Sequence, residues 1–119
     1  MFEHPLEERC YQIAKRVRVF TRRLKKDVEN FEDIKQLARA SASVGANYIE
    51  ANENVGPEDL RYRIKVSRKE AKESMHFLGL IETYGNNELE TERAYLIDEA
   101  GQLRKIFSAM LIKLGDKDS

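Results

Sequence analysis

The sequence predicts an all-α protein: an antiparallel, up-down-up-down four-helix bundle forming one domain over residues 1–119. Apolar residues recur every three or four positions in four long segments, which is the spacing of bundle helices. Helix breakers are few, and the two prolines, Pro5 and Pro57, each stand where a segment begins. No stretch alternates with a period of two, so no strand is expected. The short connections between segments favour antiparallel neighbours.

The first helix is expected over residues 5–27. Pro5 suits the first turn, where a missing N–H costs nothing, and Glu7 and Glu8 place negative charge on the N-terminal dipole. Its apolar residues are spaced alternately by four and three positions: Leu6, Cys10, Ile13, Val17, Phe20 and Leu24.

The second helix is expected over residues 31–53, with Asn30 as its N-cap and Asp33 three residues later. Large apolar residues are sparse in its middle, and small ones form two stripes. One stripe is Ala38, Ser41, Gly45 and Tyr48, and the other is Ala40, Val44, Asn47 and Ala51. We therefore expect close packing against the small residues Ser67, Ala71 and Ser74 of the third segment. A buried Ser hydroxyl can bond to a carbonyl of its own helix. A polar functional site at Ser41, Asn47 and Glu50 is the alternative.

The third and fourth helices are expected over residues 57–84 and 88–114. Pro57 begins the third helix, and Asn87 with Glu90 resembles a capping box for the fourth. Two glycines suit left-handed positions that end helices, Gly85 and Gly115. Three others lie inside periodic segments and are interpreted as close-packing positions: Gly45, Gly79 and Gly101.

The charges balance overall but not helix by helix. With 21 basic and 21 acidic residues the net charge is zero, which argues against a protein that coats nucleic acid through bulk positive potential. Residues 6–27 nevertheless carry eight basic and three acidic residues, and residues 29–53 carry two and five. The first helix thus bears a basic stripe and its flanks: Lys15, Arg16, Arg18, Arg22, Arg23, Lys25 and Lys26. It is a solvated face, a contact with a neighbouring subunit, or a nucleic-acid surface.

Motifs for catalysis and cofactors are missing. Glu73 and His76 have the spacing of di-iron ligands, but no second Glu-x-x-His accompanies them, so we predict no metal, no cofactor, no small-molecule substrate and no enzyme activity. The single cysteine, Cys10, excludes an intramolecular disulfide, suits a reducing compartment and is expected in the core. No signal peptide or membrane span is recognised, so a cytoplasmic protein without a membrane partner is expected.

Two runs resemble a known family. Residues 36–53 and 64–74 are similar to helices 2 and 3 of the bacterial four-helix-bundle family first named for reading frames inside intervening sequences of 23S ribosomal RNA. The matching polar residues are Arg39, Ser41, Ser43, Asn47, Glu50, Arg68, Glu70, Glu73 and Ser74. The resemblance implies a homopentamer without enzyme activity. A distant relative is the accessory protein of diversity-generating retroelements, a pentamer that binds nucleic acid and reverse transcriptase.

Two functions follow as expectations. The first is an assembly or interaction scaffold whose partner is itself, with subunit contacts at exposed aromatic residues: Tyr11, Phe77, Tyr84 and Tyr95. The alternative is an accessory protein that binds RNA or DNA through the basic stripe. Arg39, Glu50, Arg68, Glu70 and Glu73 are expected to form Arg–Glu pairs that fix the register of the second and third helices.

Overall fold

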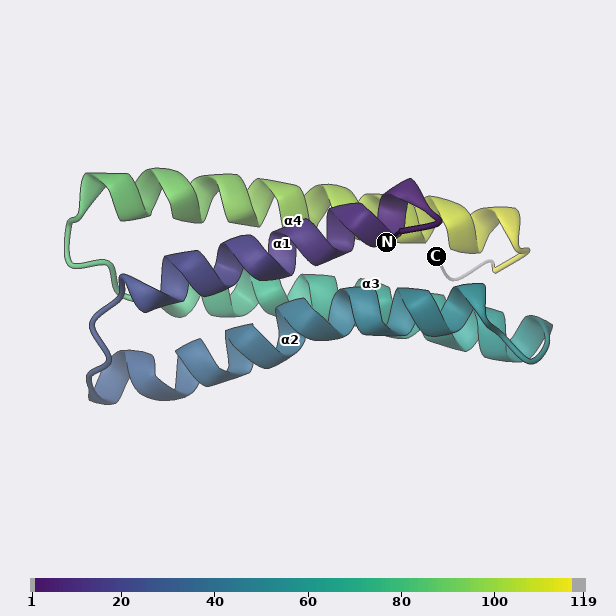
Figure 1. Cartoon of the computed structure of the whole chain (residues 1–119), viewed down its shortest axis with the longest axis horizontal. Helices are drawn as coiled ribbons and strands as arrows, with labels where there is room; N and C mark the ends of the chain where they lie inside the picture. The colour runs from purple at the N-terminus through teal and green to yellow at the C-terminus, as the bar shows by residue number, and fades with distance from the viewer. Residues whose placement is uncertain (1, 117–119) are drawn as a thin grey trace.

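The computed structural model describes residues 2–116 and places four helices in this range. They are α1 (Pro5–Arg22), α2 (Val28–Asn52), α3 (Pro57–Leu80) and α4 (Asn87–Lys113). Figure 1 shows them side by side as an elongated antiparallel bundle, as the sequence predicted. With 18 residues, α1 is the shortest.

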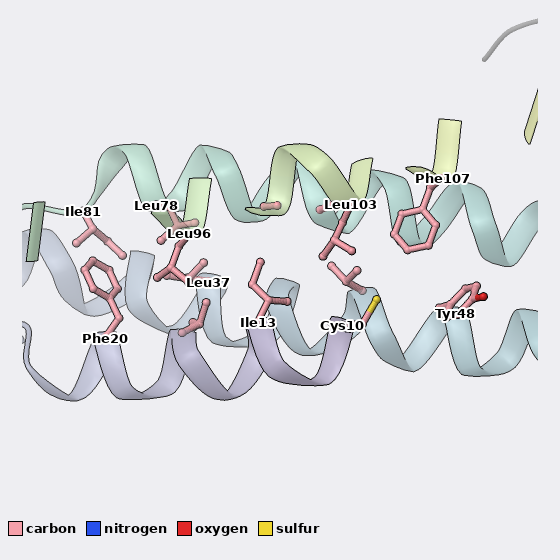
Figure 2. Packing of buried hydrophobic residues seen from close by; sticks show 14 of the residues in the cluster. Cys10, Ile13, Phe20, Leu37, Tyr48, Leu78, Ile81, Leu96, Leu103 and Phe107 are labelled. Atoms are coloured by element: carbon pink, nitrogen blue, oxygen red, sulfur yellow. The ribbon is translucent and has the colours of Figure 1, made fainter. Parts of the chain in front are cut away.

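The core follows the predicted apolar spacing. Every periodic position from Cys10 in α1 to Leu24 in the loop after it is buried, and α4 contributes Leu96, Leu103 and Phe107. Figure 2 shows these side chains meeting between the helices, with the Cys10 sulfur among them. The prediction that Cys10 serves as a small apolar core residue is confirmed.

Two helices end earlier than predicted. α1 stops at Arg22 rather than 27, and α3 stops at Leu80 rather than 84. The apolar periodicity continues past both ends because Leu24 and Ile81 still reach the core from backbone that has left the helix. Periodicity alone therefore overestimated both lengths.

The predicted N-caps were displaced. The side chain of Asp27, not Asn30, accepts the N–H of Asn30 at the start of α2. Likewise Asn86, not Asn87, accepts the N–H of Leu89 at the start of α4. In both cases another residue of a type favoured at N-caps, Asp27 or Asn86, precedes the predicted one and caps the helix instead.

Among neighbouring helices, the most extensive contact is between α2 and α3 and the least extensive is between α1 and α4. The Ser67 hydroxyl donates to the Val44 carbonyl of α2 at 2.9 Å, so the two backbones come close at this point. The predicted tight crossing of the second and third helices is confirmed. Ser67 uses a carbonyl of the neighbouring helix, whereas Ser74 uses that of Glu70 in its own helix.

Candidate functional site

Two of the seven basic residues predicted as a nucleic-acid surface are engaged within the bundle. Arg16 Nε lies 2.6 Å from Glu92, and Arg23 Nη2 lies 2.8 Å from Glu88. Arg9 makes a third such pair with Glu99 at 2.7 Å. The three arginines are seven residues apart, which is about two helical turns, so the pairs follow one edge of α1 along α4. The hydrogen bonds from Glu99 and Glu92 raise the pKa of Arg9 and Arg16, respectively.

Lys26 is engaged at the end of α1. Its ammonium group donates to the carbonyls of Thr21 and Leu24 at 3.0 and 3.2 Å. A cation at the C-terminal end of a helix satisfies carbonyls that lack an intrahelical partner and opposes the helix dipole. Lys26 therefore stabilises the helix end instead of extending the exposed stripe.

The remaining four cations form what we call the basic row. Three lie on one side of α1 and the fourth in the loop that follows, at spacings of three, four and three positions. All are exposed, and none has an ion-pair partner within residues 2–116: Lys15, Arg18, Arg22 and Lys25. Tyr11 and Tyr84 stand at its two ends, with Lys15 Nζ 5.9 Å and Lys25 Nζ 5.6 Å from the respective ring centroids. The structure thus divides the predicted stripe into three engaged and four open cations.

The outward face of α2 carries apolar residues that no described part of the chain covers. We call the apolar row the residues that share this face at intervals of three, four or seven positions: Val28, Phe31, Ala38, Ala42, Ala46 and Ile49. Val28 is 94% exposed, Phe31 52% and Ile49 46%. The middle of the row consists of alanines, which allow another helix to approach closely.

A groove of about 320 Å³ lies between the two rows. Tyr11, Ala14 and Arg18 line it from α1, and Ala42 and Ala46 line it from α2. At its base Gly45 meets Cys10, since a Cβ on Gly45 would lie 3.1 Å from the Cys10 Cβ. Burial raises the pKa of the Cys10 thiol to about 12, so this cysteine is a packing residue and not a reactive one.

Several polar residues of the predicted family motif meet across α2 and α3. Arg39 donates to Glu70 at 2.7 Å and to Glu73 at 2.8 Å. Glu70 is only 3% exposed, so Arg39 supplies the charge that compensates a buried carboxylate. Both carboxylates raise the pKa of Arg39. The expected pairing is present for these three residues.

Arg68 and Glu50 are not part of this cluster. Arg68 points to the Ser108 hydroxyl of α4 at 3.5 Å. Glu50 is exposed and has no ion-pair partner in the described range. The predicted five-residue constellation is therefore wrong in these two members, because one is turned towards another helix and the other towards solvent.

The remaining motif residues have local partners. The Ser41 hydroxyl donates to the Ala38 carbonyl at 3.3 Å, and the Asn47 amide donates to the Ser43 carbonyl at 3.0 Å. Asn47 also accepts a bond of 3.2 Å from Arg63 of α3. The first two bonds stay within α2, and only the bond from Arg63 crosses to α3. These contacts do not gather Ser41, Asn47 and Glu50 into one polar site.

Sequence reasoning missed the role of Asn30. Its side chain is fully buried and donates to the carbonyls of Lys25 and Glu82, both at 2.9 Å. Its oxygen accepts the backbone N–H of Glu82, also at 2.9 Å. One amide thus joins the α1–α2 loop to the α3–α4 loop. Its residue type and position were consistent with the predicted N-cap, and nothing else in the sequence indicated a buried contact with the α3–α4 loop.

Two of the exposed aromatic residues have partners of their own. The Tyr84 hydroxyl donates to Asp27, and this bond holds the pKa of the Asp27 carboxyl below its usual value. The Arg16 guanidinium lies 3.6 Å from the Tyr95 ring centroid. Phe77 packs partly against the core, and of these four aromatic residues Tyr11 lines the groove, where its ring centroid lies 5.1 Å from that of Phe2.

No group of three potential metal ligands exists within residues 2–116. His76 is exposed and lies edge-on to Phe77, with 5.1 Å between the ring centroids. No helix in the described part of the chain is both long enough and apolar enough to cross a membrane.

The model of the 23S rRNA-intervening sequence protein family matches residues 6–109, which cover all of α2 and α3 and nearly all of α1 and α4. The chain belongs to this family. The two motifs that suggested the resemblance, residues 36–53 and 64–74, both lie inside the matched range.

A solved structure shows the same fold as this 23S rRNA-intervening sequence family chain. It is a crystal structure of a protein of unknown function from the S23 ribosomal protein family of Bacteroides thetaiotaomicron. The two chains are 21% identical with a TM-score of 0.74, over 88% of this chain and 96% of the other. No curated protein matches this member of the family.

Proposed function

We propose that the protein is a non-enzymatic scaffold whose working form is a homo-oligomer, a ring of five as its family resemblance implies, in the cytoplasm. The uncovered apolar row of α2 carries this proposal. A helix buries its apolar face against another element, and an exposed apolar patch commonly marks an interaction site. The reduced, buried Cys10 is consistent with a cytoplasmic location.

The composition of the face also supports self-association. Its centre is apolar and contains an aromatic side chain, Tyr11, while charged residues stand at its edge. This distribution, with few charges at the centre and a polar rim, is typical of protein interfaces. The alanines at Ala42 and Ala46 would let a second helix pack at short range.

The test is Ala46→Glu, with Ala109→Glu on the exposed side of α4 as the matched control. Light scattering and native mass spectrometry should show an oligomer for the parent chain and the control. The Ala46→Glu protein should be shifted towards monomer at the same concentration, because a buried carboxylate without a partner is costly. A parent chain that is monomeric at about 100 μM, a concentration at which a 10 μM contact would be mostly formed, contradicts the proposal.

A second function, binding to RNA or DNA, is favoured by the basic row. Four exposed cations without ion-pair partners in the described range are free to contact phosphates. A single strand neutralised at four phosphates should lose affinity with salt at a logarithmic slope of about −3.

The corresponding test is the double reversal Arg18→Glu with Arg22→Glu. Its control, Lys72→Glu with Lys105→Glu, changes the net charge equally at exposed lysines of α3 and α4. Gel-shift titrations at several salt concentrations should show loss of binding for the first pair only. Binding that is insensitive to salt, or equally weak in both variants, counts against a nucleic-acid role.

A further inference from the structure

We propose that the basic row of one copy docks against the acidic start of α2 in the next copy, with neighbouring bundles lying parallel. We call the acidic start the residues Glu29, Glu32 and Asp33. This inference rests on the proposed self-association and names its two surfaces and their polarity. The occupant of the α1–α2 face is then a second copy of this chain.

The first step is that the basic row and the apolar row share one face. The groove between them is lined by Lys15 and Arg18 from α1 and by Ala42, Ala46 and Ile49 from α2. A partner that covers the apolar row must therefore also come against the basic row. Such a partner needs acidic side chains beside an apolar surface.

The second step is that the start of α2 provides those acidic side chains. Glu29 and Glu32 are exposed, with Glu29 accepting a long bond of 3.4 Å from the Tyr84 hydroxyl of its own chain, and Asp33 is half-buried without an ion-pair partner in residues 2–116. Glu32 has only a long, exposed contact with Lys35, 3.7 Å between nitrogen and oxygen. The acidic start adjoins Val28 and Phe31, which are exposed apolar residues of the same helix.

The third step is that Glu29 of the acidic start lies on the edge of α2 away from α1. Glu29 precedes Asn47 by 18 residues, which is five full turns at 3.6 residues per turn, so both lie on the same side of the helix. Asn47 contacts Arg63 of α3, so this is the edge of α2 that faces α3. The basic row lies on the other edge of the same face, where α1 runs.

The fourth step concerns the symmetry that relates neighbouring copies. If two copies met face to face in antiparallel orientation about a two-fold axis, α1 would meet α1 and the two basic rows would repel each other. Rotation about an axis that runs along the bundle instead brings the α1 edge of one copy to the α3 edge of its neighbour. Only the parallel arrangement places opposite charges together.

The fifth step fixes the level of the contact. Asn30 donates to the Lys25 carbonyl at 2.9 Å, so the end of the basic row and the start of α2 lie at the same height in the bundle. In parallel neighbours, Arg22 and Lys25 of one copy therefore stand level with Glu29 and Asp33 of the next. No sliding of one bundle along the other is needed.

The test is a charge swap in the full chain. One half-swap is Arg22→Glu with Lys25→Glu, the other is Glu29→Lys with Asp33→Lys, and the full swap combines all four changes. Each half-swap should raise the dissociation constant of the oligomer by at least about tenfold, because like charges then face each other. The full swap should restore assembly. Circular dichroism and thermal melting check that every variant keeps its helices.

The outcomes separate this inference from the proposed function. If the parent chain assembles and the half-swaps assemble equally well, the docking surface is wrong while the oligomer stands. Half-swaps that dissociate without recovery in the full swap also overturn the pairing. A monomeric parent chain overturns the oligomer and this inference together.

Zero-length crosslinking between amines and carboxylates gives a second readout. Mixed light and heavy isotopic preparations distinguish links between copies from links within one copy. Mixed-isotope peptides that join Lys25 to Glu29 or Asp33 support the parallel contact. Mixed-isotope links found only between other segments contradict it.

Discussion

At the scale of single residues, Gly45 sets how closely α1 approaches α2. A Cβ there would lie 3.1 Å from the Cβ of Cys10, which is attached directly to the α1 backbone and cannot rotate away. Gly79, which the sequence suggested as a similar close-packing position, has no atom within 4 Å of a built Cβ and is exposed. Gly45 is therefore a close-packing position and Gly79 is not, so the prediction for Gly79 was wrong.

This contrast makes a prediction. Gly45→Ala should lower the free energy of unfolding by about 1 kcal/mol, because the strain of overpacking exceeds the gain in helix propensity. Gly79→Ala, the control, should raise it by about 0.5 kcal/mol, since it gains propensity without a clash. Urea unfolding measures both values. Shifts of the same sign in the two variants would show that α1 yields easily to the added methyl group.

At the scale of helices, the α2–α3 pair is held by polar contacts as well as by packing. Arg39 reaches over the junction to the nearly buried Glu70 and to Glu73. Replacing one partner of such a pair leaves the other charge without compensation, which costs more than the pair itself contributes. Arg39 is half-exposed, so water reduces this cost.

We therefore predict that Arg39→Met lowers the free energy of unfolding by about 1–3 kcal/mol. The control is Arg104→Met, which removes an exposed arginine of α4 that has no ion-pair partner in the described range. Chemical denaturation gives the stability, and light scattering gives the assembly state. If neither quantity differs between the two variants, the pair does not fix the register of α2 and α3.

The edge between α1 and α4 is organised differently. Three Arg–Glu pairs run along the helix contact that is least extensive, and each is worth about 0.2–1 kcal/mol when exposed. They use up two cations, Arg16 and Arg23, that the sequence had assigned to a possible nucleic-acid surface. The seven-residue spacing of the arginines is visible in the sequence, but their partners lie 65 to 90 residues further along the chain, in α4.

At the scale of the whole molecule, the fold could be predicted because it depends on apolar spacing, which is local. The positions of apolar residues such as Ile13 and Leu103 were enough to predict the four helices, their order and their core. The helix ends were less accessible, because Leu24 and Ile81 reach the core without being helical. The candidate site was accessible only in part, since the division of the basic stripe depends on which side chains of α4 face α1.

The net charge of zero likewise conceals an uneven distribution of charges along the chain. The balance of 21 basic and 21 acidic residues hides a positive α1 beside a negative start of α2. If the docking inference holds, neutrality is a property of the assembly as much as of the chain, since two of the four open cations of one copy, Arg22 and Lys25, are opposed by carboxylates of the next.

The buried amide of Asn30 has a consequence for the evolution of the chain. It connects the α1–α2 loop to Glu82 of the α3–α4 loop, 52 residues after Asn30, and its three hydrogen bonds require both backbones to keep their present course. An insertion or deletion in either loop would break bonds made by the other. Selection should therefore act on these two loops as one inherited unit, with changes in the length of one accepted only alongside changes in the other.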